Sequence, residues 1–483
     1  MQLKEHLLHI IESLSRVVPE TWLAFAFLLL VTAELVLKIT RWSQQTSTVL
    51  WFSAFGLSLV GLVLVILQWN APEGYLFHHL LYLDTKAVFF KGLILVATLV
   101  VLLHIRVTHS QLPTEFYSIL LAVVLGLCFM TMSVNGLSVY LSIELVSIGS
   151  YLLASIGKGK LAAEGGIKYL LFGALSSGIM LYGLSFLYGM TGSLDLTSDV
   201  FANHLAQNHP VLVLIIGFLT LGGVLFKLSL VPFHVWAPDV YEGAPIPIVS
   251  FLSTAPKAAA LLLLMRLLSS FTADFQSLMA LLALSSILVG NLSALWQNDL
   301  KRLLAYSGIA QAGFALVGVV AFNQAGFESA TFYIVIYVLT NLTAFLLVDL
   351  VSSGRPTLLS LSGKGAQLPV LAVCFVVVMI ALVGLPPTAG FTSKLLVFSA
   401  LWEANASAPS SLLIALLVVG LLNAVVSLFY YFKIPFYLFF KTHNDTGSET
   451  NKTTGTALVL VLTVAIVVLF LKTDWLMAWV KQL

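Results

Sequence analysis

Long apolar segments recur along the whole chain, and no other feature limits its fold so strongly. The stretch TALVLVLTVAIVVLFL, residues 456–471, is one example, and the 483 residues together are 59% hydrophobic and only 9% charged. A bilayer core about 30 Å thick requires about 20 apolar residues per helix, and backbone groups inside it must be satisfied within that helix. The alternation typical of barrel strands is absent. The sequence therefore predicts an all-α polytopic membrane protein, embedded in a lipid bilayer.

We predict fourteen transmembrane helices within a single membrane domain, residues 1–483. Their centres lie near residues 29, 58, 96, 124, 145, 179, 220, 258, 285, 311, 340, 380, 423 and 468, and the twelfth extends to about 402 across an interruption. Residues 1–20 have the pattern of a short amphipathic segment and lack the small-residue cleavage site of a signal peptide. Two polar stretches, 354–367 and 442–455, have the composition of exposed loops.

The charged residues inform topology more than they inform binding. Twelve Lys and Arg residues fall in the loops on one side of the predicted helices and six on the other. The richer side is expected to be cytoplasmic, which places both termini on the non-cytoplasmic side. A net charge of +2 with scattered basic residues gives no reason to expect a nucleic-acid partner. Cys128 and Cys374 lie in separate apolar runs, so we assign them to packing rather than to a disulfide or a metal site.

Four ionisable residues lie where the predicted helices cross the bilayer core. Glu144 is near the middle of the fifth helix, Lys227 closes the seventh, Lys257 lies inside the eighth, and Lys394 follows the interruption of the twelfth. Insertion of one charge at that depth costs about 2.5 to 3.5 kcal/mol, so such residues face the protein interior. Burial disfavours a charged lysine and a nearby carboxylate favours it, so a small rearrangement can switch its protonation. The set predicts a proton relay.

We propose the pair Glu144 and Lys227 as the trigger of this relay, against the alternative of a static salt bridge. Lys168 is a second candidate for the relay, although its position near a helix end also allows its ammonium to reach the membrane surface. The same surface position is the favoured interpretation of Lys91. His234 either relays protons near neutral pH or caps a broken helix.

Prolines interrupt two of the predicted helices. Pro232 lacks a backbone N–H and ends or kinks the seventh helix, and the following stretch VWAPDVYEGAPIPI is expected to be an irregular connection. The twelfth helix is interrupted by Pro386, Pro387 and Gly390. A break at membrane depth is tolerated only against protein or internal water. Lys227 precedes its break, near a helix C-terminus, whereas Lys394 follows its own, near an N-terminus that disfavours a cation.

The two interruptions lie five helices apart, which is the spacing of an inverted internal repeat. The repeats would cover residues 112–270 and 275–436, each supplying a half-channel. The second half carries fewer charges and more hydroxyl and amide groups, which can hold a water wire or form hydrogen bonds between helices. These groups are Tyr306, Ser307, Gln311, Tyr333, Tyr337, Asn341, Asn423 and Tyr430. For any single member the hydrogen bond is the favoured interpretation.

Four segments carry a family resemblance. They are FKLSLVPFHVWAPDVYEGAPIPIVSFLSTAPKAAALLLLMRLL at 226–268, SIELVSIGSYLLAS at 142–155, QNDLKRLLAYSGIAQAGF at 297–314 and GLPPTAGFTSKLLVF at 384–398. With these segments the chain resembles the antiporter-like, proton-pumping membrane subunits of respiratory complex I (NADH:quinone oxidoreductase). PFHVWAPDVYEGAPIP and STAPK are most similar to the subunit N, or subunit 2, group, and the resemblance covers nearly the whole chain.

The resemblance implies a fourteen-helix subunit with two inverted five-helix repeats and broken helices 7 and 12. It also implies that Glu144, Lys227, Lys257 and Lys394 are the relay residues of helices five, seven, eight and twelve. Other membrane subunits would be its partners in a bacterial inner membrane. NADH, flavin, iron–sulfur clusters and quinone would bind on those partners, and no cofactor or metal is expected in this chain. Consistent with this, no GxGxxG opens a helix, and SGKG at 362–365 lacks the upstream glycine of a phosphate loop.

Two other functions use the same sequence features. A component of a multisubunit sodium/proton antiporter would use the same buried groups without electron transfer. A structural membrane scaffold would leave three lysines at membrane depth without a purpose.

Overall fold

The computed structural model describes residues 10–39, 46–157, 159–271, 275–352, 354–441 and 453–483. Within these ranges thirteen helices are long and apolar enough to cross a membrane. They coincide with thirteen of the fourteen predicted spans. The remaining one, the interrupted twelfth, is present as two shorter helices. The chain is therefore the all-α polytopic membrane protein that its sequence predicts. Residues 10–16 of the predicted amphipathic segment are helical, and most of the predicted loop 442–455 lies outside the described residues.

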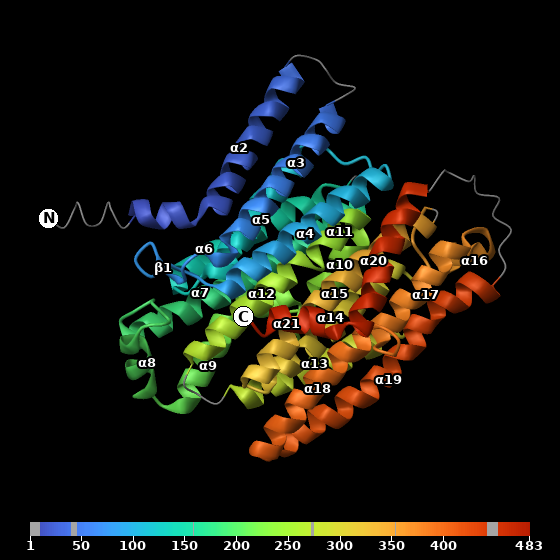
Figure 1. Ribbon diagram of the computed structural model, residues 1–483. Helices are drawn as coiled ribbons and strands as arrows, with labels where there is room; N and C mark the ends of the chain where they lie inside the picture. Colours follow the sequence, from blue (N-terminus) through green and yellow to red (C-terminus); the bar gives the residue numbers. More distant parts are fainter. Residues whose placement is uncertain (1–9, 40–45, 158, 272–274, 353, 442–452) are drawn as a thin grey trace. The chain divides into compact units, whose positions relative to one another are not determined.

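The chain forms two compact units. The first comprises residues 1–102, 111–227 and 255–275. Its elements are α2 (Val18–Ile39), α3 (Thr46–Leu67), η1 (Gln68–Asn70), β1 (Gly74–Leu76), β2 (Leu81–Leu83), most of α4 (Thr85–Val107), α5 (Glu115–Met132), α6 (Gly136–Ser155), α7 (Lys160–Thr191), α8 (Asp199–Ala206), α9 (Pro210–Leu228) and α12 (Ala255–Ser270). The strands form an antiparallel hairpin that pairs Gly74 with Leu83. Helices α2 and α3 lie side by side (Figure 1), and α5 packs on both α2 and α6.

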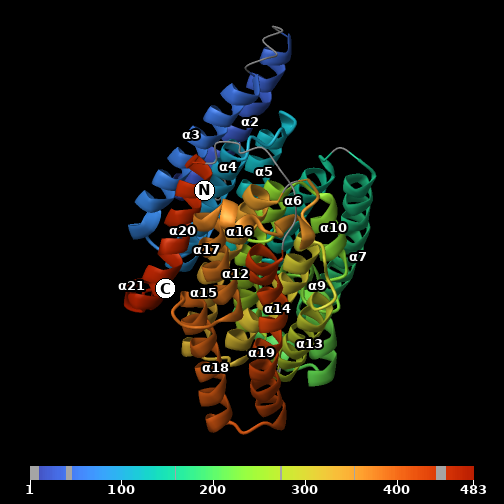
Figure 2. The same ribbon diagram turned by 90° about the vertical axis from the view of Figure 1, so that its right-hand side faces the viewer.

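The second unit comprises residues 103–110, 228–254 and 276–483. Its elements are α10 (Trp236–Gly243), α11 (Ile246–Leu252), α13 (Gln276–Ala294), α14 (Leu300–Val320), α15 (Gln324–Val351), η2 (Leu359–Leu361), α16 (Lys364–Gln367), α17 (Pro369–Val383), α18 (Ala389–Ser407), α19 (Ser411–Phe440), α20 (Thr453–Leu471) and α21 (Thr473–Val480). Helices α14 and α15 are buried along almost their whole length. Helix α18 packs beside α19 (Figure 2) and contacts α14, α15 and α17.

Both proline-rich segments coincide with helix ends. Helix α9 ends at Leu228, turns follow through residue 235, and α17 and α18 are separated by residues 384–388. The bonds Val231–Pro232 and Pro386–Pro387 are cis. The prediction of an irregular connection after Pro232 is wrong in one respect, because residues 236–243 form helix α10. Pro238 is compatible with that helix since it lies in the first turn, where its missing N–H would have no intrahelical partner.

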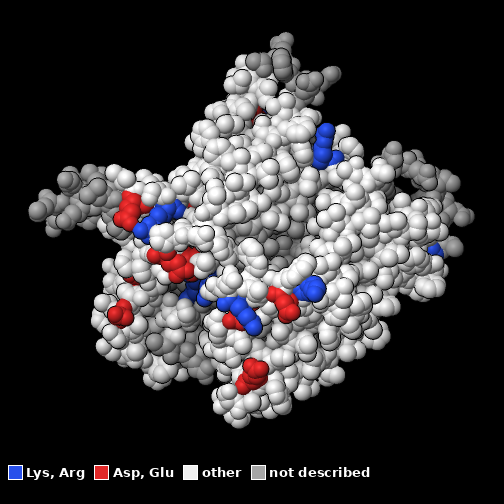
Figure 3. Space-filling model, in the orientation of Figure 1, with Lys and Arg blue, Asp and Glu red and all other residues white. Residues whose placement is uncertain are grey.

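Figure 3 shows one face of the molecule, on which charged side chains are sparse. On the face drawn in Figure 3, Lys, Arg, Asp and Glu form a few small groups in a field of uncharged side chains. Many large apolar side chains are exposed, including Phe25 at 53%, Leu28 at 58% and Phe429 at 65%. A surface of this kind is expected of a protein whose solvent is lipid, because apolar side chains cost nothing there.

Candidate functional site

Lys227 lies in the last turn of α9 and is only 2% exposed. Its Nζ is 5.8 Å from the ring centre of Tyr151 and 5.6 Å from that of Tyr169. Among the described residues its Nζ has no hydrogen-bond partner. The lysine therefore meets aromatic faces rather than a polar cage.

Glu144 lies near the middle of α6, in the same unit as Lys227. Its buried Oε1 also lacks a hydrogen-bond partner within the part of the chain that the structure describes. The two members of the predicted trigger pair are thus not joined by a hydrogen bond. Ser142 and Ser150, on the same helix as Glu144, donate to carbonyls of that helix. In this state the pair is not the static salt bridge of the alternative prediction.

Lys257 also belongs to the first unit and is 2% exposed. It is the third residue of α12, which begins at Ala255 just after α11 ends at Leu252. The predicted eighth span is therefore itself interrupted, at Ser253 and Thr254, which sequence reasoning missed. The signal was Pro256, the second residue of α12, which has no backbone N–H to donate to the carbonyl of Leu252 and therefore interrupts the helix there.

Lys394 is 6% exposed and belongs to the second unit. Its Nζ donates to the carbonyls of Val383 at 2.6 Å and Leu382 at 3.3 Å, and it lies 4.4 Å from the ring centre of Phe314. These carbonyls end α17, so the ammonium meets a helix C-terminus, which favours a cation. The expectation of an unfavourable N-terminus is wrong because the side chain reaches back across the break.

Gly390 makes this reach possible. It lies in the first turn of α18, and a Cβ there would lie 1.8 Å from the carbonyl oxygen of Ala381 in α17. No side chain fits at that distance, so the start of α18 contacts the end of α17 directly. Pro386 and Pro387 lie in the connection between them and are exposed. The break therefore folds back on itself and brings Lys394 to the α17 carbonyls.

A buried polar network lies beside Lys394. Gln311 donates to the carbonyl of Leu382 at 2.7 Å and to the hydroxyl of Tyr431 at 3.1 Å, and it accepts from Tyr333. A cavity lies next to Gln311, Tyr333 and Lys394. Its volume, counted as the space open to the centre of a water molecule, is about 10 Å³. That volume is at the lower limit for holding one water molecule.

Most of the predicted polar groups of the second half form hydrogen bonds between helices. Tyr430 donates to Asn291 at 2.9 Å, and Tyr337 donates to the carbonyl of Ser253 at 3.0 Å. The favoured interpretation of these groups is thereby confirmed. Sequence reasoning missed Tyr431 and Asn291, because a polar residue within an apolar run gives no sign of which other helix it will meet.

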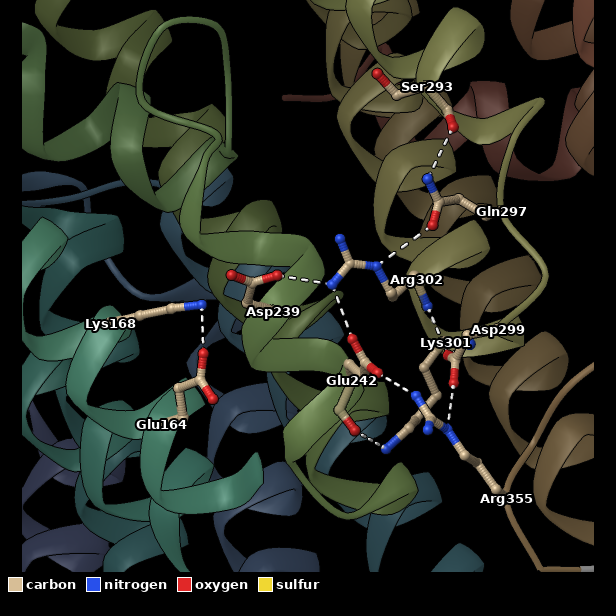
Figure 4. Close-up of polar contacts among 10 residues, drawn as sticks. All are labelled: Glu164, Lys168, Asp239, Glu242, Ser293, Gln297, Asp299, Lys301, Arg302 and Arg355. Carbon is tan, nitrogen blue, oxygen red and sulfur yellow. Dashed lines mark hydrogen bonds and ion pairs between the residues drawn. The ribbon is translucent and has the colours of Figure 1, made fainter. Parts of the chain in front are cut away.

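An ionic network joins α10 to the start of α14 and to the segment after α15, all within the second unit (Figure 4). Arg302 pairs with Asp239 at 2.7 Å and with Glu242 at 2.8 Å. Arg355 pairs with Glu242 and Asp299. The ammonium of Lys301 donates to the carbonyls of Glu242 and Ala244 at the C-terminal end of α10. Charge balances within the network, so it holds α10 rather than forming a charged binding surface.

The remaining predicted residues lie as follows. Lys168 pairs with Glu164 of its own helix at 2.7 Å and is 37% exposed (Figure 4). His234 lies in the turn between α9 and α10, and within the described residues its buried Nδ1 has no hydrogen-bond partner. The expectation that Lys91 reaches the surface is wrong, because it is fully buried and pairs with Glu20 at 2.6 Å.

In the described part of the chain, no group of three or more His, Cys, Asp or Glu could hold a metal ion. Cys128 and Cys374 are buried free thiols, as predicted. The candidate site consists of acids, bases and hydroxyls, which are groups that can gain and lose protons. Glu144, Lys227 and Lys257 belong to the first unit, and Lys394 and His234 to the second.

Comparisons with known proteins agree with this chemistry. The profile of the family described as "NADH:quinone oxidoreductase/Mrp antiporter, TM" matches residues 133–427. The NADH-quinone oxidoreductase subunit N 2 of Chloroherpeton thalassium is 37% identical in an alignment 480 positions long, which covers 93% of this chain and 91% of the relative. A chain of respiratory complex I from Thermus thermophilus is 29% identical with a TM-score of 0.78 and covers 94% of this chain and 98% of its own. A chain of the Mrp complex from Dietzia sp. DQ12-45-1b is similar in fold alone, with 20% identity, a TM-score of 0.80 and 96% of both chains covered.

Proposed function

Because the chain belongs to the NADH:quinone oxidoreductase/Mrp antiporter transmembrane family, we propose that it is a proton-translocating membrane subunit of an NADH:quinone oxidoreductase, of the subunit N type. It takes part in the translocase reaction without carrying a redox centre. NADH, flavin, iron–sulfur clusters and quinone bind to partner subunits, and the other membrane subunits of the complex are its neighbours in the bacterial cell membrane. The excess of basic loop residues places both termini on the non-cytoplasmic side.

The observation that carries this proposal is the burial of three lysines inside apolar helices of the matched region. Lys227, Lys257 and Lys394 are 2%, 2% and 6% exposed. Buried basic groups of this kind are expensive in a membrane and mark ion pathways. A static scaffold has no use for three of them.

The relay proceeds by changes in protonation at these residues. A charged Glu144 favours the charged form of Lys227. When Glu144 loses its charge, or when the two side chains move apart, Lys227 releases its proton toward Lys257. Lys394 holds its proton against the α17 carbonyls and passes it through the polar groups around Gln311. Lys168 and His234 serve as further donors on the entry path. The two halves, 112–270 and 275–436, act as inverted repeats around breaks at Pro232 and at Pro386, Pro387 and Gly390.

The test uses the assembled complex in inverted membrane vesicles, with proton uptake and NADH oxidation recorded together. Lys227→Ala and Lys394→Ala are expected to lower proton uptake per NADH oxidised at least about tenfold, because each removes a transfer site. Lys472→Ala removes an exposed lysine between α20 and α21 and is the matched control. Normal uptake in both buried-lysine variants would refute the relay.

A component of a multisubunit sodium/proton antiporter remains the alternative, since the family description names both kinds of protein. The same vesicles separate the two. In the proposed function, proton movement requires NADH and does not depend on sodium. Proton release that follows a sodium pulse without NADH would favour the antiporter.

A further inference from the structure

The surroundings of Lys227 contain two tyrosines that the proposed relay does not use. Tyr151 comes from α6, Tyr169 from α7, and both are largely buried. Their rings meet edge to face, with centroids 4.8 Å apart and planes at 78°. Phe226, next to Lys227 in α9, stacks on Tyr169 with centroids 5.7 Å apart. Three helices of the first unit thus place aromatic rings around one ammonium.

Aromatic faces carry partial negative charge and attract a cation that lies within about 6 Å of the ring centre. Both tyrosine rings meet this condition at 5.8 and 5.6 Å from Nζ. The attraction is strongest where water is excluded, and Lys227 is 2% exposed. Nζ has no hydrogen-bond partner among the described residues, and the two tyrosine rings contact its charge from α6 and α7.

Helix α7 is shaped to accept Tyr151. At Gly173 an added Cβ would lie 1.8 Å from the Tyr151 hydroxyl oxygen and 2.5 Å from its ring carbon Cζ. Any side chain at position 173 must therefore displace the tyrosine. On the same helix, Gly178 has open space where its Cβ would be. The contact at Gly173 is thus particular to that position and to Tyr151.

We propose that the rings of Tyr151 and Tyr169, held in place through Gly173, form an aromatic seat that positions the ammonium of Lys227 and stabilises its charged form when Glu144 does not. This inference deepens the proposed relay and rests on it. In the seat the proton stays on Lys227 until a hydrogen-bonding acceptor replaces the rings, because a ring face attracts the cation but cannot accept its proton. Tyr151 and Tyr169 are positioning residues, and the proposal assigns their effect on Lys227 to the rings rather than to the hydroxyl groups.

The first test changes the rings in the assembled complex and measures proton uptake per NADH oxidised. Tyr151→Phe and Tyr169→Phe keep the ring and are expected to pump normally. Tyr151→Leu and Tyr169→Leu remove it and are expected to lower uptake about threefold or more. Phenylalanines with increasing fluorine content at position 151 keep the ring's shape but weaken its negative face. Uptake that falls with each added fluorine supports the seat, whereas equal uptake across the series refutes it, because packing alone depends little on fluorine.

The second test leaves both tyrosines in place. Gly173→Ala is expected to displace Tyr151 and lower uptake as Tyr151→Leu does, while Gly178→Ala on the same helix is expected to pump normally. Complex assembly is measured in parallel, so that a loss of folded protein is not counted as a loss of pumping. If Lys227→Ala abolishes uptake but the ring and glycine variants pump normally, the seat is refuted and the relay stands. If Lys227→Ala and Lys394→Ala also pump normally, the relay itself fails.

Discussion

Burial should decide how much lysine–carboxylate contacts of nearly equal length contribute to the free energy of unfolding. Lys91 and Glu20 are 0% and 1% exposed and lie 2.6 Å apart. Lys38 approaches Glu34 at 2.7 Å and Glu115 at 2.6 Å, but it is 49% exposed. With an effective dielectric constant of about 20, attraction at 2.6 Å is about 6 kcal/mol before desolvation is subtracted. Lys91→Met leaves a buried carboxylate without its cation and should cost about 3 to 5 kcal/mol. Lys38→Met should cost only about 0 to 1 kcal/mol, because its ammonium is half exposed and Glu34, itself only 9% exposed, keeps a hydrogen bond from Thr114.

The assay is equilibrium unfolding of the full chain in mild detergent as the fraction of sodium dodecyl sulfate rises. The free energy of unfolding is compared for the parent chain, Lys91→Met, Lys38→Met and the double variant Glu20→Gln with Lys91→Met. The double variant should regain most of the stability that Lys91→Met loses, because it leaves no buried charge. Equal losses for Lys91→Met and Lys38→Met would show that burial does not govern these pairs.

Two further predictions concern the second unit, with the same unfolding assay. Gly390→Ala should cost about 1 to 3 kcal/mol because its Cβ would meet the Ala381 carbonyl at 1.8 Å. The control Gly178→Ala has open space around it and should be neutral or slightly stabilising. Similar changes in the free energy of unfolding for both variants would contradict the close approach of α17 and α18. In the ionic network, Lys301→Met should cost about 1.5 to 3 kcal/mol because two buried carbonyls lose a charged donor. Arg355→Met, at 61% exposure, should cost less than about 1 kcal/mol, and the reverse order would be inconsistent with a buried clamp on α10.

The spans and the buried charges were predictable because each depends on local sequence. A run of about twenty apolar residues specifies a membrane helix wherever it lies, and a lysine within such a run is conspicuous. The break at Pro232 was predictable for the same reason, since proline acts on its own helix. The interruption at Ser253 and Thr254 had a local signal of the same kind in Pro256, which sequence reasoning overlooked.

The sequence did not reveal which groups the buried lysines contact. Lys91 was expected at the surface, and only packing of α4 against α2 revealed its pairing with Glu20. Lys394 was expected to meet a helix N-terminus, and only the folded-back break placed its ammonium on the carbonyls of the preceding helix. A long lysine side chain moves its charge several ångströms from its Cα, so position along the chain does not fix where the charge lies.

The amino-acid sequence alone determined that the chain lies in a membrane as a set of apolar helices and which ionisable groups they carry inside. The tertiary structure decided what each of those groups faces, such as the two tyrosine rings beside Lys227 and the α17 carbonyls beside Lys394. The physical reason is the distance along the chain over which each effect acts. Hydrophobicity and proline act within one helix, whereas the contact that stabilises a buried charge comes from whichever distant segment packs against it.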